Sequence, residues 1–126
     1  MIMRKYLSLF GLTIIVLLTA ATASAGRLFT TTLSGSQEVP PNASPATGSG
    51  TVLLDDARTT ITVNLSFSGL LAPATAAHIH GPANPGTNAP VLIIFTGFPN
   101  ATSGTYPSHT FAVTPTQVSQ LVTGQL

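Results

Sequence analysis

Two histidines one residue apart form the clearest chemical signal in this sequence. His78 and His80 stand in the segment Ala77-His78-Ile79-His80-Gly81. In a β-strand, residues two apart project from the same face, so the two imidazoles are expected to lie side by side. Histidine is the commonest metal ligand, and such a pair can bind one ion of copper or zinc. The alternative is a structural role, in which the rings hydrogen-bond backbone carbonyl groups of the long loop that follows. The pattern alone is weak evidence for a metal and favours the structural role.

The third histidine, His109, is the weaker candidate for a metal ligand. It shares an expected strand with Phe111 and Val113. Side chains two apart on a strand lie on one face. We therefore expect His109 on a mostly apolar face, satisfied by a hydrogen bond, with a role as third ligand as the alternative.

The remaining residue types give little support to catalysis. The sequence holds no cysteine, and no serine stands in a Gly-x-Ser-x-Gly nucleophile motif. Its acids are Glu38, Asp55 and Asp56. The two aspartates fall in an expected hairpin turn, where aspartate is favoured because it hydrogen-bonds nearby backbone groups. We expect Glu38 to be a surface residue, with ligand orientation as its alternative role, and we expect no enzymatic activity.

The N-terminal segment has the three parts of a secretory signal peptide. Arg4 and Lys5 precede an apolar run of 12 residues, Leu7 to Leu18, and the segment ends in Ala23-Ser24-Ala25. This order predicts a signal peptide over residues 1–25, cleaved after Ala25. The apolar run is shorter than the roughly 20 residues that cross a bilayer. We therefore expect a secreted, extracellular or periplasmic protein whose mature part, residues 26–126, is one domain.

Charge excludes two classes of partner for the mature part. Arg27 and Arg58 stand against three acids, which gives a net charge of −1. Nucleic-acid binding needs several cationic phosphate contacts, and attraction to anionic lipid needs a polybasic cluster. Neither is available, so no nucleic acid and no membrane partner is expected after cleavage. Because cysteine is absent, packing and sheet hydrogen bonds must stabilise the domain without disulfides.

Period-two alternation indicates an all-β fold. From Thr60 to Phe67 apolar and polar residues alternate strictly, which predicts a strand with one buried and one solvated face. Residues Gly50 to Leu54 precede it across the turn Asp55 to Arg58, which predicts an antiparallel hairpin. Further expected strands are Arg27 to Ser34, Thr75 to His80, Val91 to Phe95 and Ser108 to Val113. Proline- and glycine-rich connectors separate them: Val39 to Pro45, Gly81 to Pro90 and Gly97 to Pro107. Short strands with such connectors are typical of an antiparallel β-sandwich or barrel.

One short helix is expected near the C-terminus. Thr114 is followed by Pro115 at the first helical position and by Gln117 three residues on, which is a capping-box pattern. Gly124 supplies a stop signal. The pattern predicts a helix from Pro115 to Val122 that covers an open end of the sheets.

Two motifs and their order resemble a known family. Leu33 to Pro41 reads L-S-G-S-Q-E-V-P-P and Ala77 to Ala83 reads A-H-I-H-G-P-A; between them lie Gly48-Ser49-Gly50 and Gly69-Leu70. From about Phe29 to the C-terminus the chain resembles the CHRD domain of chordin and of bacterial exported proteins. The resemblance implies an immunoglobulin-like β-sandwich outside the cell and no established catalytic reaction. Chordin members are associated with sequestering growth-factor ligands, although a family resemblance does not transfer a ligand.

The chain departs from the family pattern at its C-terminal end. The resemblance implies further strands, one with a histidine, after the Leu-x-x-Gly segment, whereas this sequence reads Gly124-Gln125-Leu126 there. We expect an open sheet edge, reduced stability and a tendency to self-associate through that edge.

Three functions remain open on the sequence. The leading hypothesis is a secreted non-catalytic binding, surface or matrix module with an unknown extracellular protein or surface ligand. The second is a copper- or zinc-binding domain with a redox role through His78 and His80. That pair is similar to one in copper/zinc superoxide dismutase, but a two-metal centre needs more than three imidazoles, so dismutation is not expected. The third is an assembly subunit joined through sheet edges.

Overall fold

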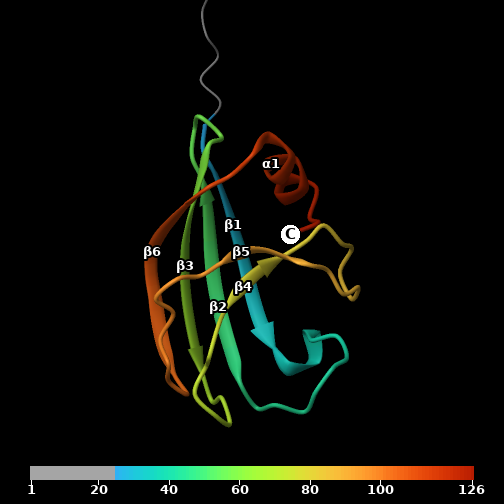
Figure 1. Cartoon of the computed structure of the whole chain (residues 1–126), viewed down its shortest axis with the longest axis vertical. Helices are drawn as coiled ribbons and strands as arrows, with labels where there is room; N and C mark the ends of the chain where they lie inside the picture. Colours follow the sequence, from blue (N-terminus) through green and yellow to red (C-terminus); the bar gives the residue numbers. More distant parts are fainter. Residues whose placement is uncertain (1–24) are drawn as a thin grey trace, which may run out of the picture.

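A computed structural model describes residues 25–126, and the predicted signal peptide lies, except for Ala25, outside the described residues. Six strands, one short 3₁₀ helix and one α-helix follow one another along the chain (Figure 1). Their bounds are β1 Arg27–Ser34, η1 Gly35–Gln37, β2 Thr47–Leu54, β3 Thr60–Ser68, β4 His78–His80, β5 Val91–Ile94, β6 Gly104–Ala112 and α1 Pro115–Val122.

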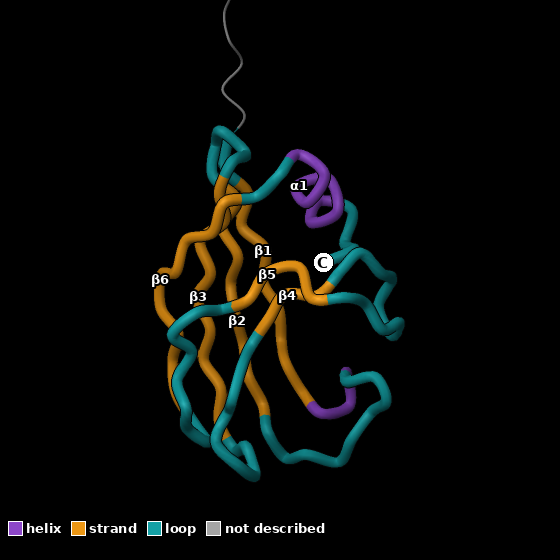
Figure 2. The backbone as a smooth tube through the Cα atoms, viewed as in Figure 1, coloured by secondary structure: helices purple, strands orange, loops and turns teal. Residues whose placement is uncertain are grey.

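The strands form two antiparallel layers. Four long strands make one sheet in the order β1-β2-β3-β6, and β4 pairs with β5 alone in a second, smaller sheet. The small sheet lies in front of the large one, and α1 lies at one end of both (Figures 1 and 2). The predicted all-β antiparallel sandwich with one short C-terminal helix is confirmed.

The central hairpin follows the sequence signals closely. Leu54, the last residue of β2, is the register partner of Ile61 near the start of β3, and the chain turns between them. Asp55 N–H donates to the Thr60 carbonyl at 3.0 Å, and Arg58 N–H donates to the Asp55 carbonyl at 3.0 Å. Arg58 completes the turn with φ of 57°, in the left-handed region. The predicted turn over Asp55 to Arg58 is therefore present.

Strand β6 begins four residues earlier than predicted, inside the expected connector Gly97 to Pro107. Pro107 is compatible with a strand here because β6 lies at the edge of the large sheet, where a missing N–H costs little. A bulge opposite Asn64 absorbs the irregularity: Ser108 has φ of 50°, and its N–H donates to Asn64 Oδ1 at 2.8 Å. The strand is therefore continuous because of the Asn64 side chain, which is 44 residues away from Ser108 in the sequence. Local sequence signals do not reveal this contact.

Two other strand bounds also differ from the predicted ones. β2 begins at Thr47 rather than Gly50, because it pairs with β1 along its whole length. β4 covers only the last three residues of the expected Thr75 to His80 strand. The chain before it is bound to a different loop, since Ala74 N–H donates to the Ala101 carbonyl at 2.9 Å.

The core lies between the sheets at the end covered by α1. Leu54, Ile61 and Val63 of the large sheet are at most 2% exposed, and Ile93 and Val118 cover them from the small sheet and the helix. The expected capping box is formed: Gln117 N–H donates to Thr114 Oγ1 at 3.2 Å, and Thr114 N–H donates to the Gln117 side chain at 2.9 Å. The predicted helix and its covering role are confirmed.

A chain of stacked aromatic rings ties the layers together below this core. Tyr106 on β6 packs against Phe95 and Phe98, with ring centroids 5.4 and 5.2 Å apart. Phe98 stacks in turn on Phe67 of β3 at 5.1 Å. The Tyr106 hydroxyl donates to the Thr96 carbonyl at 2.8 Å, so the ring is fixed at both ends.

Candidate functional site

The two predicted histidines lie together on β4, as their spacing requires. Their ring centroids are 5.8 Å apart and the rings meet edge to face at 77°. Ala77 and Ile79, which alternate with them, pack against the core, so the imidazoles occupy the opposite face of the strand. His80 Nδ1 lies 2.9 Å from the Ala89 carbonyl in the loop that follows, and this contact is the expected structural role for His80.

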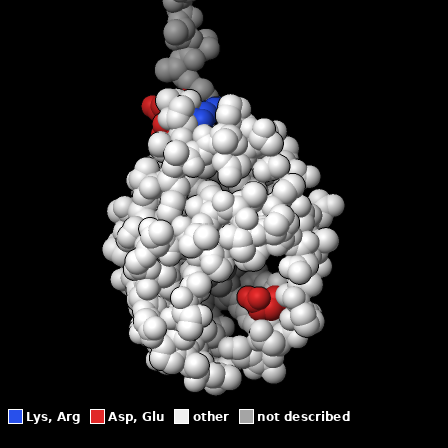
Figure 3. All heavy atoms as spheres, viewed as in Figure 1, with Lys and Arg blue, Asp and Glu red and all other residues white. Residues whose placement is uncertain are grey.

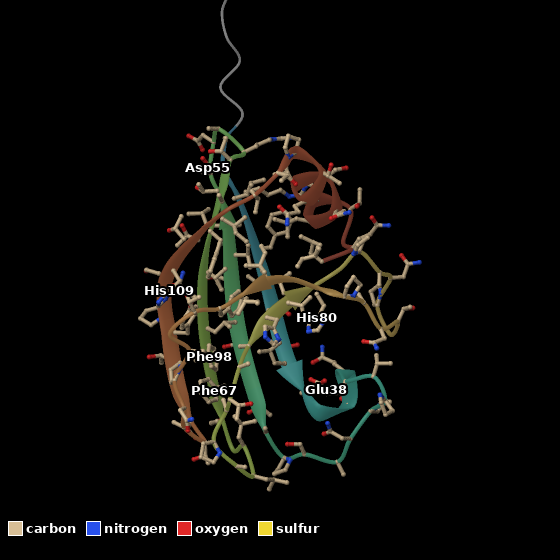
Figure 4. The ribbon with its side chains drawn as sticks, viewed as in Figure 1. Glu38, Asp55, Phe67, His80, Phe98 and His109 are labelled. Carbon is tan, nitrogen blue, oxygen red and sulfur yellow. The ribbon has the colours of Figure 1, made fainter. Side chains whose placement is uncertain are left out.

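The structure brings Glu38 to the same region, which spacing along the chain does not indicate. Glu38 follows η1, and its N–H donates to the Gly35 carbonyl at 3.3 Å. The same carbonyl accepts from Asn42 N–H at 2.8 Å, so the loop folds back on itself. A side chain at buried Gly35 would lie 2.9 Å from the Asn42 carbonyl, so this close approach requires glycine. Figure 4 shows Glu38 below His80, across an opening between β4 and this loop.

A groove runs between β4 and the loop that carries Glu38, and we call it the β4 groove. Its floor is the inner face of the large sheet at Leu33, Gly48 and Phe67, which are register partners on β1, β2 and β3. One wall is the segment 76–80, and the other is the loop of Glu38. The space-filling view shows an acidic side chain inside a hollow whose visible surroundings are uncharged (Figure 3), at the place where Figure 4 labels Glu38.

The groove exists because the small sheet does not cover this end of the large one. Gly48 on this floor carries no side chain, and the Leu33 side chain leans toward it, 3.2 Å from where a Cβ would stand. Leu33 consequently remains 43% exposed although it projects from the inner face, whereas Leu54, on the same face at the other end, is 2% exposed. The groove volume of about 480 Å³ falls within the roughly 300–1,000 Å³ of ligand sites.

His109 belongs to a different part of the molecule. It lies on β6, stacks on Tyr106 with ring centroids 3.6 Å apart, and places Nδ1 2.9 Å from the Pro107 carbonyl. Its register partner is the buried Val63, which agrees with the predicted apolar face. Among residues 25–126 there is no group of three or more histidine, cysteine or acidic side chains that could bind one metal ion. The structure therefore does not join His109 to His78 and His80.

Asp55 has a structural part in the β2–β3 turn. Its carboxylate accepts hydrogen bonds from Thr60 N–H at 2.8 Å, from Thr59 N–H at 2.7 Å and from the Thr59 hydroxyl at 3.0 Å. These bonds, that from Thr60 foremost, lower the pKa of the Asp55 carboxyl. Asp56 accepts a hydrogen bond from Gly26 N–H and so ties the start of β1 to the turn. Asp55 has the turn role that the sequence predicts, whereas Asp56 lies in the turn and binds the start of the domain instead.

The β4 groove offers several groups that can bind a ligand. Serine catalysis needs a hydroxyl within hydrogen-bond reach of a base. Ser34, which lines the groove, instead directs its hydroxyl to Ser36 and Gln37, at 2.9 and 3.0 Å. The groove offers one carboxylate, two imidazoles, an apolar floor and the backbone groups of β4. Such a surface can hydrogen-bond and bury a ligand.

Comparison with known proteins agrees with this architecture. Residues 29–126 match the family described as the CHRD domain. The chain belongs to the CHRD domain family. No curated protein and no solved structure matches the chain. The resemblance stated from the motifs is confirmed, and it runs from Phe29 to the last residue, as expected. CHRD domains are typical of extracellular proteins, and within residues 25–126 no helix is long and apolar enough to span a membrane.

Sequence reasoning found the histidine pair but missed the floor of the groove. The sequence places Leu33 in a motif and an expected strand, Gly48 in a motif just before an expected strand, and Phe67 on the buried face of its strand. The available signal was the glycine of the Gly48-Ser49-Gly50 segment, since an inward-facing glycine in a strand marks a place with little side-chain filling. Its strand neighbours could be identified only once the register was known.

Proposed function

We propose that this CHRD domain is a secreted, non-catalytic module that binds an extracellular partner at the β4 groove. The observation that carries the proposal is the uncovered inner face of the large sheet, with half-exposed Leu33 on it and Glu38 beside it. Apolar surface that stays exposed lowers the stability of a small domain. An exposed apolar patch with a polar rim is typical of an interaction site.

Export supports an extracellular partner. The sequence predicts a signal peptide over residues 1–25, and the family is typical of extracellular proteins. The low charge of the mature part argues against electrostatic partners such as nucleic acid or anionic lipid. A protein or an uncharged surface polymer fits this composition better.

Copper or zinc binding at His78 and His80 is the alternative, and it has less support. A protein zinc site uses three or four protein ligands, and the described residues assemble no such group around the pair. His80 Nδ1 already contacts the Ala89 carbonyl, so only the Nε2 atom of this imidazole is available to an ion. We expect calorimetry with Zn²⁺ or Cu²⁺ to show no tight stoichiometric site. Tight binding that is lost in a His78→Ala/His80→Ala double variant would establish the alternative.

A binding experiment with cell-surface and matrix material tests the proposed function. The protein is expressed from its full sequence, purified from the exported fraction and incubated with the cell-surface and matrix material of its own host. We expect saturable retention without chemical change of the retained material. Absence of saturable retention, or specific turnover of a component, would contradict the proposed function.

A further inference from the structure

The floor of the β4 groove is an interior surface that is only partly covered: Phe98 stacks on Phe67 at 5.1 Å, and Leu33 has no such partner ring. At the covered end, Leu54 and Ile61 are sealed by the small sheet and α1, with exposed fractions of 2% and 1%. At the groove end, Leu33 projects from the same face but is 43% exposed. Nothing in residues 25–126 extends the small sheet over this position, because β4 pairs only with β5.

The backbone of β4 presents an open edge to this space. On one side, the Ala77 carbonyl accepts from Phe95 N–H and Gly81 N–H donates to the Pro90 carbonyl, both at 3.0 Å and both toward the chain of β5. Backbone groups of alternate residues in a strand point to opposite edges. Those of His78 and His80 therefore point away from β5, and within the described chain they pair with no second strand. Such an edge is a template for another strand.

The C-terminal residues fix where the open edge begins. Ala83 N–H donates to the Gln125 carbonyl at 3.1 Å, and a side chain at Gly81 would overlap Leu126. Gln125 and Leu126 thus cover the chain just beyond β4. The edge that stays open comprises the residues before Gly81, beside the apolar floor.

The charge of Glu38 determines which kind of added strand suits the β4 groove. Glu38 is the only charged side chain among the residues that line the groove, and it lies on the wall opposite β4. An added strand would direct alternate side chains to the floor and the others outward, next to the imidazoles of His78 and His80. Apolar residues suit the floor positions, and a basic residue among the outward positions suits Glu38.

We propose that the β4 groove binds an extended segment of a partner protein as an added β-strand along His78–His80. Its apolar side chains alternate against Leu33 and Phe67, and a basic side chain on its other face pairs with Glu38. Main-chain hydrogen bonds supply affinity in this mode of recognition, and the alternating pockets supply specificity. This inference rests on the proposed binding function and names the class of partner and its place.

A synthetic peptide provides the direct test. The probe is a fluorescein-labelled, capped heptapeptide, Thr-Val-Lys-Val-Thr-Val-Thr, titrated with the purified full chain and followed by fluorescence anisotropy. Two control peptides carry glutamate in place of the lysine, or proline in place of the adjacent residues Val and Thr at positions four and five, so that a ladder N–H donor is lost whichever edge of the peptide faces β4. We expect saturable binding of the probe, weaker binding of the glutamate peptide and none of the proline peptide.

Two leucines on β1 give a matched pair of protein variants. Leu33 and Leu28 are both exposed, at 43% and 60%, but Leu28 projects from the outer face, beside Leu53. We expect Leu33→Asp to weaken probe binding by about tenfold or more, and Leu28→Asp to leave it unchanged. Glu38→Gln should weaken binding about two- to fivefold, because an exposed ion pair contributes little. Glu38→Lys should reverse the preference toward the glutamate peptide. Circular dichroism of each variant verifies that it is folded.

The possible results separate this inference from the broader function. Absence of saturable binding by the probe overturns the proposal of an added strand. So does a proline peptide that binds as tightly as the probe, or a Leu33→Asp variant that binds the probe as tightly as the unsubstituted protein. If host surface material is still retained and Leu33→Asp does not affect it, the binding function stands and the groove is the wrong site. Self-association in sedimentation that Leu33→Asp abolishes would instead identify the occupant as a second copy of the chain. Loss of all retention contradicts the function itself.

Discussion

Removing the hydroxyl of Tyr106 isolates the hydrogen bond that fixes the aromatic chain between the sheets. Tyr106 is 1% exposed, and its hydroxyl donates to the Thr96 carbonyl at 2.8 Å. Tyr106→Phe keeps the stacking on Phe95, Phe98 and His109 and deletes only this bond. The loss of one such bond costs about 0.5–1.5 kcal/mol. Tyr106→Ala also removes the ring and leaves a cavity, at a cost of about 3–5 kcal/mol.

These costs are large relative to the stability of a domain of this size. A single domain unfolds with a free energy of about 5–15 kcal/mol, so a loss of about 3–5 kcal/mol in Tyr106→Ala should remove roughly a fifth of it or more. A loss of about 1 kcal/mol lowers the melting temperature of a 100-residue domain by roughly 4–8 °C. We expect Tyr106→Phe to melt lower by about that amount and Tyr106→Ala to be barely folded at 37 °C.

Urea unfolding followed by circular dichroism measures both variants. Thr105→Val, a substitution on the solvated face of the same strand, is the control and should change the unfolding free energy by less than about 0.5 kcal/mol. If Tyr106→Ala costs no more than Thr105→Val, Tyr106 does not connect the two sheets and the described core is wrong.

Three further predictions follow from local contacts. Because its hydrogen bonds lower the pKa of Asp55 in the folded state, its contribution is complete above the carboxyl's ordinary range and is lost as pH falls through the folded pKa. Asp55→Asn should therefore flatten the loss of unfolding free energy in acid, measured by urea unfolding from pH 7 to pH 2; an unchanged slope would refute this role. Thr114→Ala breaks the capping box and should cost about 1 kcal/mol, whereas exposed Thr116→Ala in the same turn should cost less; equal losses would argue against the cap. Gly81→Ala would place a Cβ 2.8 Å from the Gln125 carbonyl and should cost about 1–3 kcal/mol in thermal melts; an unchanged melting temperature would show that the C-terminal residues are not bound there.

Local patterns predicted the elements whose causes are local. The helix Pro115–Val122 follows from a capping box and a terminal glycine, and β3 follows from strict alternation of apolar and polar residues. The start of β6 could not be predicted, because it depends on the bond from Ser108 to Asn64 on a neighbouring strand.

The candidate site was predictable only in part for the same reason. The spacing of His78 and His80 places them on one face, but not on the face away from the core. The β4 groove depends on the register that aligns Leu33, Gly48 and Phe67, and on the loop that brings Glu38 across from β4. Both are relations between segments far apart in the sequence.

Amide hydrogen exchange at β4 tests the central claim most directly. Residue-resolved exchange is recorded by NMR for the free protein and for the protein saturated with the lysine heptapeptide. In the free protein we expect fast exchange at His78 and His80 and protection at Ile79, which pairs with Ile93. Peptide binding should slow exchange at His78 and His80 by about tenfold or more, as new ladder bonds form. Unchanged exchange at both histidines, or new protection confined to the strands of the large sheet, would contradict the account.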